Sequence, residues 1–255
     1  MYANYHTHTW RCNHASGTER EYVENALKAG LKILGFSDHA PYLFPGEYYS
    51  TFRMRPEQLE DYVRTVLSLR QEYAGCLEIP LGLELEFYPQ LLPQLLPVLR
   101  DQPLDYLILG QHFVDNEFDS RYNGLTSFDK KLLIRYVDQS IDAMQTGLFT
   151  YFAHPDLMNY VGDHRIYQKE MRRLCREAKA CGIPLEYNLL GLGGKRHYPH
   201  FRFWETVAEE GCAVVLGRDA HDPAALLDIK TEEKALRQLS CLGLKPLDTV
   251  TLRKI

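Results

Sequence analysis

The sequence lacks the features of several protein classes. No segment approaches the roughly eighteen consecutive apolar residues that a membrane-spanning helix needs. The N-terminal stretch MYANYHTHTW has neither the basic start nor the apolar run of a signal peptide. Six cysteines are present, but none belongs to a CxxC pair, and their placement does not suggest a disulfide scaffold. We therefore expect a cytoplasmic protein with reduced thiols and no membrane partner.

The sequence also has no excess of positive charge and no visible domain boundary. Its formal net charge of −5 gives no general electrostatic reason to bind a nucleic acid polymer, so a small substrate is favoured. No internal repeat, low-complexity tract or charge block suggests a linker. A chain of 255 residues with 45% hydrophobic content can form one α/β barrel. We predict a single catalytic domain over residues 1–255.

Seven short β-prone runs alternate with segments of mostly helical periodicity. The expected strands are residues 3–6, 33–37, 79–87, 106–109, 149–153, 184–188 and 213–217. Strands separated by helices pair in parallel, and a closed barrel is the compact way to arrange them. An open doubly wound sheet remains the alternative, but the Gly-rich turn expected after its first strand is missing. The pattern predicts an α/β fold with a TIM-like barrel.

Several residues mark the expected helix ends. Thr18 and Glu21 fit a capping box, and Gly30 fits the end of the helix that they begin. Pro56 fits the first position of the next helix. Further helices are expected over residues 132–144, 168–182 and 201–211, whereas prolines every four residues predict an interrupted segment over residues 89–97.

Histidines gather at the ends of the predicted strands. Seven of the ten histidines follow a strand at its carboxyl end, and in a barrel all these ends meet on one face. They are His6, His8, His14, His39, His112, His154 and His221. A single histidine at such a position is more often structural than a ligand. Six separate segments that each deliver an imidazole to one face predict a metal centre.

Carboxylates accompany these histidines. Glu84 and Glu86 share one face of an otherwise apolar strand, where a buried charge needs a metal cation or, alternatively, an arginine as partner. Asp219 and His221 follow another strand at a spacing that suits zinc, manganese or iron. Asp38 either orients an imidazole or caps the turn that follows it.

The motifs HTH, SDH, GLE, GQH, AHPD and DAH, in this order and spacing, resemble the polymerase and histidinol phosphatase (PHP) superfamily. The resemblance runs from the first of these motifs to the last and implies a distorted (β/α)7 barrel with two to three divalent ions, zinc, manganese or iron. Carried over residue by residue, the implied metal ligands are His6, His8, His14, His39, Glu84, His112, His154, Asp219 and His221. Glu84 is expected to bridge two ions.

Two stretches, HTHTWRCNHASGT and NLLGLGGKRHYP, are similar to the histidinol-phosphatase branch of this superfamily, although Gln111 and Arg218 depart from its pattern. The branch implies hydrolysis of L-histidinol phosphate, a step of histidine biosynthesis, by a metal-activated hydroxide in a trinuclear centre. Glu84, Asp219 and His221 are the catalytic candidates.

Substrate-binding candidates come from the loops at the same face. Lys195 and Arg196 follow the sixth strand, which carries no implied ligand, and the preceding GLGG is expected to let this loop fold over the barrel mouth. Arg165, Arg218 and His197 are further candidates for phosphate binding. The leaving group could receive its proton from a metal-bound water, from Asp219 or from His197.

Other functions stay open at this stage. The closest alternative is a PHP phosphoesterase for another small phosphate ester or nucleotide. An amidohydrolase-type deaminase or amidase shares the HxH motif, but the lysine that often follows its fourth strand is missing from LILGQHF. A non-catalytic metal-binding module predicts that ligands are lost, whereas all nine positions carry ligand-type residues.

Overall fold

Parallel strand pairs joined through helices build the structure, which is a computed structural model that describes residues 1–255. The strands are β1 (Ala3–Asn4), β2 (Ile33–Leu34), β3 (Phe36–His39), β4 (Leu81–Leu85), β5 (Tyr106–Leu109), β6 (Leu185–Asn188) and β7 (Val214–Gly217). β1 pairs with β2, β4 lies between β3 and β5, and β6 pairs with β7, all in parallel. The predicted α/β class with parallel pairing is confirmed.

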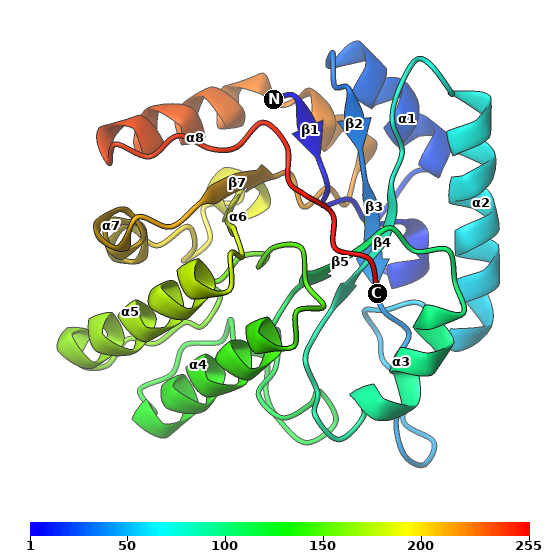
Figure 1. Cartoon of the computed structure of the whole chain (residues 1–255). Helices are drawn as coiled ribbons and strands as arrows, with labels where there is room; N and C mark the ends of the chain where they lie inside the picture. The colour runs from blue at the N-terminus through cyan, green and yellow to red at the C-terminus, as the bar shows by residue number, and fades with distance from the viewer.

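Helices surround these strands (Figure 1). The α-helices are α1 (Glu19–Lys28), α2 (Leu59–Glu72), α3 (Leu92–Arg100), α4 (Lys130–Gln145), α5 (His164–Ala180), α6 (Leu189–Gly193), α7 (Phe201–Glu210) and α8 (Ile229–Cys241). Short 3₁₀ helices cover Trp10–Cys12, Pro56–Gln58 and Pro223–Leu227. None of the helices combines the length and the apolar character that crossing a membrane requires.

Isolated backbone bridges link the three sheets. Phe152 pairs with Leu109 of β5 and Leu185 of β6, and Thr7 pairs with Ala220. The run 149–153, predicted as a strand, therefore contributes only the bridging residue Phe152. The extended backbone ends there because His154 adopts a positive φ of 34°.

The helix signals had mixed outcomes. The Thr18–Glu21 capping box at α1 is confirmed, and Pro56 is the first residue of the 3₁₀ helix that leads directly into α2. The predicted interruption over residues 89–97 was wrong from residue 92 onward, where α3 begins. Pro93 lies in the first turn of this helix, where no amide donor is needed, so only Pro97 lies inside the helix. The helices α6 and α8 were not predicted. GLGG is not an open loop, because most of it forms α6, which the Asn188 side chain caps.

The C-terminal segment covers the end of the structure at which the strands begin. A small apolar cluster between the strands includes Ala3, Ile33 and Tyr106, each the first residue of its strand. Val250 and Leu252 pack against this cluster, and Figure 1 shows the C-terminal segment crossing the strands. The opposite end, where the strands finish, is left for the polar residues described next.

Candidate metal centre and substrate pocket

A pocket of about 710 Å³ opens where the strands end. Seven of the nine residues expected to bind metal line it, namely His14, His39, Glu84, His112, His154, Asp219 and His221. The remaining two, His6 and His8, are fully buried and have ligand atoms close to those of residues that line the pocket. The structure thus brings together all nine residues that the sequence singled out.

Strand register places these residues side by side. His39 of β3 and Glu84 of β4 are direct partners across the parallel pair. On the other side, the amide of His8 donates to Ala220 O at 2.9 Å and the amide of Ala220 donates to His6 O at 3.1 Å. Backbone pairing therefore joins the HTH segment to the DAH segment, although more than 200 residues separate them in the sequence.

Glu84 lies at the centre of the cluster. Its Oε2 atom faces the nitrogens of three imidazoles at 3.0 to 3.6 Å, those of His6, His8 and His39. Its Oε1 atom faces two more at 2.9 and 3.7 Å, those of His154 and His112. A side chain on the residue at Gly110 would overlap this carboxylate, so the glycine of GQH makes room for it. Each oxygen of one carboxylate thus points toward a different set of imidazoles.

Hydrogen bonds at the Nδ1 atoms fix how the histidines point. The Nδ1 atom of His6 lies 2.8 Å from Glu186 Oε1, and that of His112 lies 2.8 Å from Glu86 Oε1. His14 and His221 have backbone carbonyl partners for Nδ1 at 2.8 and 3.0 Å. A histidine that donates from Nδ1 keeps Nε2 free as a metal ligand.

Two Nε2 atoms lie unusually close to each other. His6 Nε2 and His8 Nε2 are 3.1 Å apart, and Asp219 Oδ1 lies 3.5 and 3.3 Å from them. The Nδ1 atoms of both rings face carboxylates, those of Glu186 and Asp38, so both Nε2 atoms point at the same space. A metal cation in that space could bind both nitrogens together with Asp219.

The carboxylates in the cluster are ionised. Burial alone would raise the pKa of Glu84, but His112, His39 and His6 hold it well below the usual range. Burial likewise opposes ionisation of Asp219, yet His6 and His8 hold its pKa well below the usual value. Both carboxylates therefore present charged oxygens to the imidazoles around them.

Several of the surrounding imidazoles are neutral. Burial, together with the neighbouring His8, lowers the pKa of His221 to about 3. Burial also lowers the pKa of His39 well below its ordinary value, and it lowers that of His14. Neutral imidazoles are the form that binds metal ions.

Buried donor atoms without partners fit divalent metal ions. His39 Nδ1, Glu84 Oε2 and His221 Nε2 are buried and make no hydrogen bond. Triplets of ligand atoms lie within 4.8 Å of one another, including those of His6, Glu84 and His154, those of His6, His8 and Asp219, and those of His14, His39 and His221. Imidazole nitrogens with carboxylate oxygens are the donor set of zinc, manganese and iron. The residues therefore fit two to three such ions.

His154 and Asp219 hold backbone conformations that are uncommon for residues with side chains. Their φ angles are 34° and 49°. Such a conformation costs on the order of 1–3 kcal/mol outside glycine and is concentrated at functional sites. The strain indicates that the fold holds the side chains of His154 and Asp219 in positions that serve the site.

The partner of Glu86 differs from that of Glu84. Arg53 donates to both oxygens of Glu86 at 3.1 and 3.0 Å, so the arginine alternative holds for this carboxylate. Because Glu86 also accepts from His112, it orients a neighbouring imidazole. Asp38 faces His8 Nδ1 at 3.4 Å, as expected of a residue that orients an imidazole, and it also accepts from the amide of His39 within β3 at 2.8 Å.

Two residues of β6 support the cluster although the sequence analysis did not single them out. Glu186 faces His6 and also accepts from the amide of His154 at 3.0 Å. Asn188 donates to Asp219 Oδ2 at 3.1 Å. The same signal that marked Glu84 and Glu86, polar residues two apart within an apolar strand, is present in PLEYNLL and could have found them.

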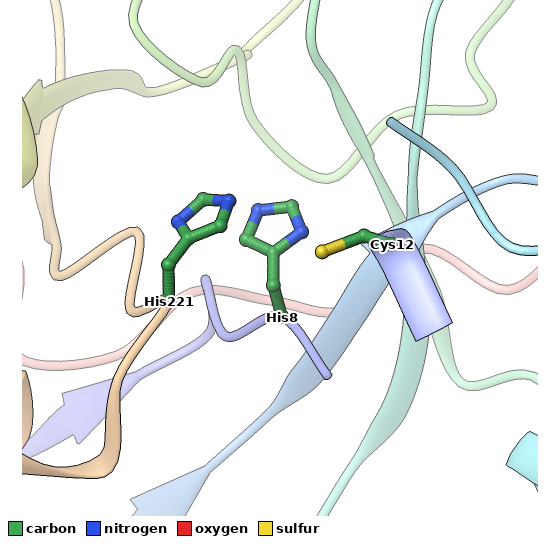
Figure 2. A group of neighbouring side chains, drawn as sticks. All are labelled: His8, Cys12 and His221. Atoms are coloured by element: carbon green, nitrogen blue, oxygen red, sulfur yellow. The ribbon is translucent and has the colours of Figure 1, made fainter. Parts of the chain in front are cut away.

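Cys12 lies beside the cluster and was likewise not expected there. Figure 2 shows the His8 ring between the His221 ring and the Cys12 thiol, and the ligand atoms of these three residues lie within 4.8 Å of one another. Burial raises the pKa of the Cys12 thiol, so the thiol stays protonated. A protonated thiol is a poor metal ligand, and we leave Cys12 out of the ligand set.

The five basic candidates for substrate binding have different positions. Arg196 and His197 line the pocket, and Arg196 Nη1 donates to Tyr198 OH at 2.8 Å. Lys195 and Arg165 are exposed and do not line the pocket.

Arg218 corrects the sequence-based expectation. Its guanidinium pairs with Glu232 and donates to Asp228 O at 2.6 Å, so it is not available to a substrate. The next residue, Asp219, lines the pocket instead. Arg218 therefore stabilises the attachment of α8 to the strands.

Aromatic rings complete the pocket. Phe52, Phe113, Tyr122 and Tyr198 line it together with Leu190. None of the four rings was expected to line a pocket, because nothing in the local pattern separates a pocket ring from a core ring.

Comparisons with known proteins agree with this geometry. Residues 4–189 match the model of the PHP domain family. A probable histidinol-phosphatase from Deinococcus radiodurans is 34% identical over 230 residues, which cover 86% of this chain and 85% of that protein.

Two solved structures share the fold. One is histidinol phosphate phosphatase from Lactococcus lactis in complex with zinc, L-histidinol and phosphate, with a TM-score of 0.76, 19% identity and 98% of both chains covered. The other is a putative histidinol phosphatase from Listeria monocytogenes, with a TM-score of 0.74, 18% identity and coverage of 90% of this chain and 99% of that one. At these identities the likeness concerns the fold.

Proposed function

This chain belongs to the PHP domain family, and from that premise we propose that it is a metal-dependent phosphomonoester hydrolase whose substrate is L-histidinol phosphate. The reaction converts the ester and water into L-histidinol and phosphate and belongs to histidine biosynthesis. The relative from Deinococcus radiodurans, whose name is probable histidinol-phosphatase, supports this choice of substrate.

One observation carries the proposal. Seven imidazoles and two ionised carboxylates converge at the floor of a pocket, and Arg196 stands at its wall. We propose that His6, His8, His14, His39, Glu84, His112, His154, Asp219 and His221 hold two to three divalent ions. When bound, these ions supply Lewis-acid activation of a water nucleophile and neutralise charge on the phosphate.

The remaining steps fall to side chains around the pocket. Arg196 binds phosphate oxygens, and the Tyr198 hydroxyl keeps its guanidinium in place. Asp219 is held ionised and has no proton to give. Burial and the neighbouring Arg196 lower the pKa of His197, which favours a neutral imidazole. Its Nε2 atom lies 2.7 Å from Leu157 O. We therefore propose that water, not a side chain, protonates the leaving oxygen.

The finer architecture is part of the same proposal. The bridges through Phe152 and through Thr7 and Ala220 connect the three sheets in order around the pocket. We propose that they form one distorted, closed (β/α)7 barrel, and that residues 1–255 are a single catalytic domain.

We also propose that the substrate is a small phosphorylated molecule and not a nucleic acid polymer. The proposed location is the cytoplasm, because all six cysteines are free thiols.

A comparison of substrates tests the proposed function. The purified protein is reconstituted with manganese or zinc, its metal content is measured, and kcat/KM is determined for L-histidinol phosphate and a panel of other phosphomonoesters. We expect two to three ions per chain and the highest kcat/KM for L-histidinol phosphate. Metal without phosphatase activity would favour a binding module, and a higher kcat/KM for a nucleotide or sugar phosphate would favour another small ester.

A further inference from the structure

One side of the pocket is aromatic and carries no charge. Phe52 and Phe113 both line it, and their rings stack with centroids 5.7 Å apart and planes at 25°. We call these two residues the aromatic wall. Both are half-buried, so each ring presents part of its surface to the pocket.

The aromatic wall and the basic side of the pocket adjoin different parts of the cluster. The Phe52 ring packs edge-on against His39 and His112, with centroids 5.2 and 6.0 Å away. Arg196 is instead attached to Tyr198, whose ring lies 6.0 Å from that of His154. A phosphate bound by Arg196 therefore leaves the wall to the organic part of the ester.

The aromatic wall is held rigidly from behind. Arg53, the neighbour of Phe52 in the chain, is only 1% exposed and lies 4.5 Å from the centroid of the Phe52 ring. Its guanidinium donates to Ala40 O at 2.8 Å, to Glu86 at 3.1 and 3.0 Å, and to Glu117 at 2.9 Å. These contacts tie the wall to the ends of β3 and β4 and to the segment after β5. A surface fixed before binding loses little entropy when a ligand packs on it.

From these contacts, and resting on the phosphatase function proposed above, we propose that the aromatic wall is the leaving-group subsite and selects esters whose alcohol carries a planar aromatic ring. A ring such as imidazole packs on Phe52 and Phe113 and is removed from water. The hydroxyls of a sugar or polyol would lose water there without gaining partners, because phenyl rings offer no strong acceptor.

A pair of substrates isolates the ring. L-histidinol phosphate is compared with L-alaninol phosphate, which is the same amino alcohol ester without the imidazole, in the metal-loaded wild type, Phe52→Leu and Phe113→Leu. We expect each variant to lose about 10-fold more kcat/KM on the ring-bearing ester than on the ring-less one. Binding of L-histidinol, followed by calorimetry, should weaken by a similar factor of about 10.

Phe118→Leu is the matched control. Phe118 lies on the same segment as Phe113, but its side chain is exposed and packs on Tyr48 outside the pocket. This variant should alter neither rate. Equal losses on both esters, or no loss on either, in both wall variants would overturn the subsite and leave the phosphatase function standing. A wild-type enzyme that hydrolyses neither ester would instead overturn the phosphatase function, and the subsite with it.

Discussion

Glu84 and Glu86 differ in their partners although they share one strand face. Glu84 has an oxygen without a hydrogen-bond partner and is surrounded by imidazoles, whereas Glu86 is neutralised by Arg53. We expect Glu84→Gln to lose metal and nearly all activity, because an amide does not bring the charge that a bridging ligand provides. Glu86→Gln should cost less, about 10- to 100-fold in metal affinity, because it misorients His112 and leaves the buried Arg53 with Glu117 as its remaining carboxylate partner.

Metal content and kcat/KM measured on both variants check this assignment. The two substitutions are matched, since both residues are fully buried in or next to β4 and both change a carboxylate to an amide. If both variants lost metal and activity to the same extent, the bridging carboxylate would have been assigned wrongly.

Arg196 and Lys195 provide a second matched pair at the residue level. Arg196 lines the pocket and Lys195 does not. Removing a charge-assisted contact to phosphate should cost on the order of 2–4 kcal/mol, or roughly 30- to 1000-fold in kcat/KM, for Arg196→Ala. Lys195→Ala should stay near the wild-type value, and metal content should not change in either variant. Near-normal kcat/KM in Arg196→Ala would show that the phosphate is held elsewhere.

At the scale of elements, the start of α7 depends on one buried carboxyl group. Asp156 Oδ2 accepts from the amide of His200 at 2.5 Å and from Trp204 Nε1 at 3.1 Å, so it anchors the helix next to the loop that carries Arg196. Burial raises the pKa of Asp156 to about 7. An unfolded aspartate has a pKa of about 3.9, so the folded state binds more protons between these values.

The sign of the pH effect follows from this difference. The raised pKa makes the contribution of Asp156 to stability fall as the pH rises from about 4 to about 7, and the loss is complete above that window. Asp156→Asn keeps an oxygen acceptor but cannot ionise. Relative to the wild type, its melting temperature should therefore improve between pH 5 and pH 8, measured at equal metal concentration. A difference that does not change with pH would mean that Asp156 does not titrate in this range and would contradict the raised pKa.

Local sequence patterns were sufficient to predict some of the strands and helices but not others. β5 and α7 were predicted almost to the residue, because an unbroken apolar run and a terminal Gly211 mark their limits locally. The strand expected over residues 149–153 was reduced to Phe152 by the backbone turn at His154, which no propensity scale reveals. The same limit hid α6, whose glycines are poor helix formers outside this context.

The site was predictable to the extent that its residues follow strands. Each residue of the proposed ligand set ends or follows an apolar run, so the sequence alone could assign it to one face. The contacts that support the ligands could not be predicted in this way, because they join residues far apart in the sequence. Glu186 reaches His6 across 180 positions, and Arg53 reaches Glu117 across 64, so only the folded chain brings them together.

For the molecule as a whole, the proposed ions should contribute to stability. Ionised carboxylates and opposed imidazole nitrogens are costly to bury without a cation. A ligand present at about 100 times its Kd adds about 2.7 kcal/mol, which corresponds to a rise in melting temperature of roughly 5–10 °C for a chain of this size. We expect a chelator to lower the melting temperature by this amount and added manganese or zinc to restore it. The Glu84→Gln variant should respond much less, and an equal response would place the stabilising ions elsewhere.

The most direct test of the proposed metal centre is to locate the ions. Crystals grown with manganese can be measured by anomalous scattering, which identifies each ion independently of any assumption about its ligands. We predict two or three peaks at the floor of the pocket, each within bonding distance of His, Glu84 or Asp219 atoms from the nine proposed ligands. No peak in the pocket, or peaks bound only by residues outside this set, would contradict the account.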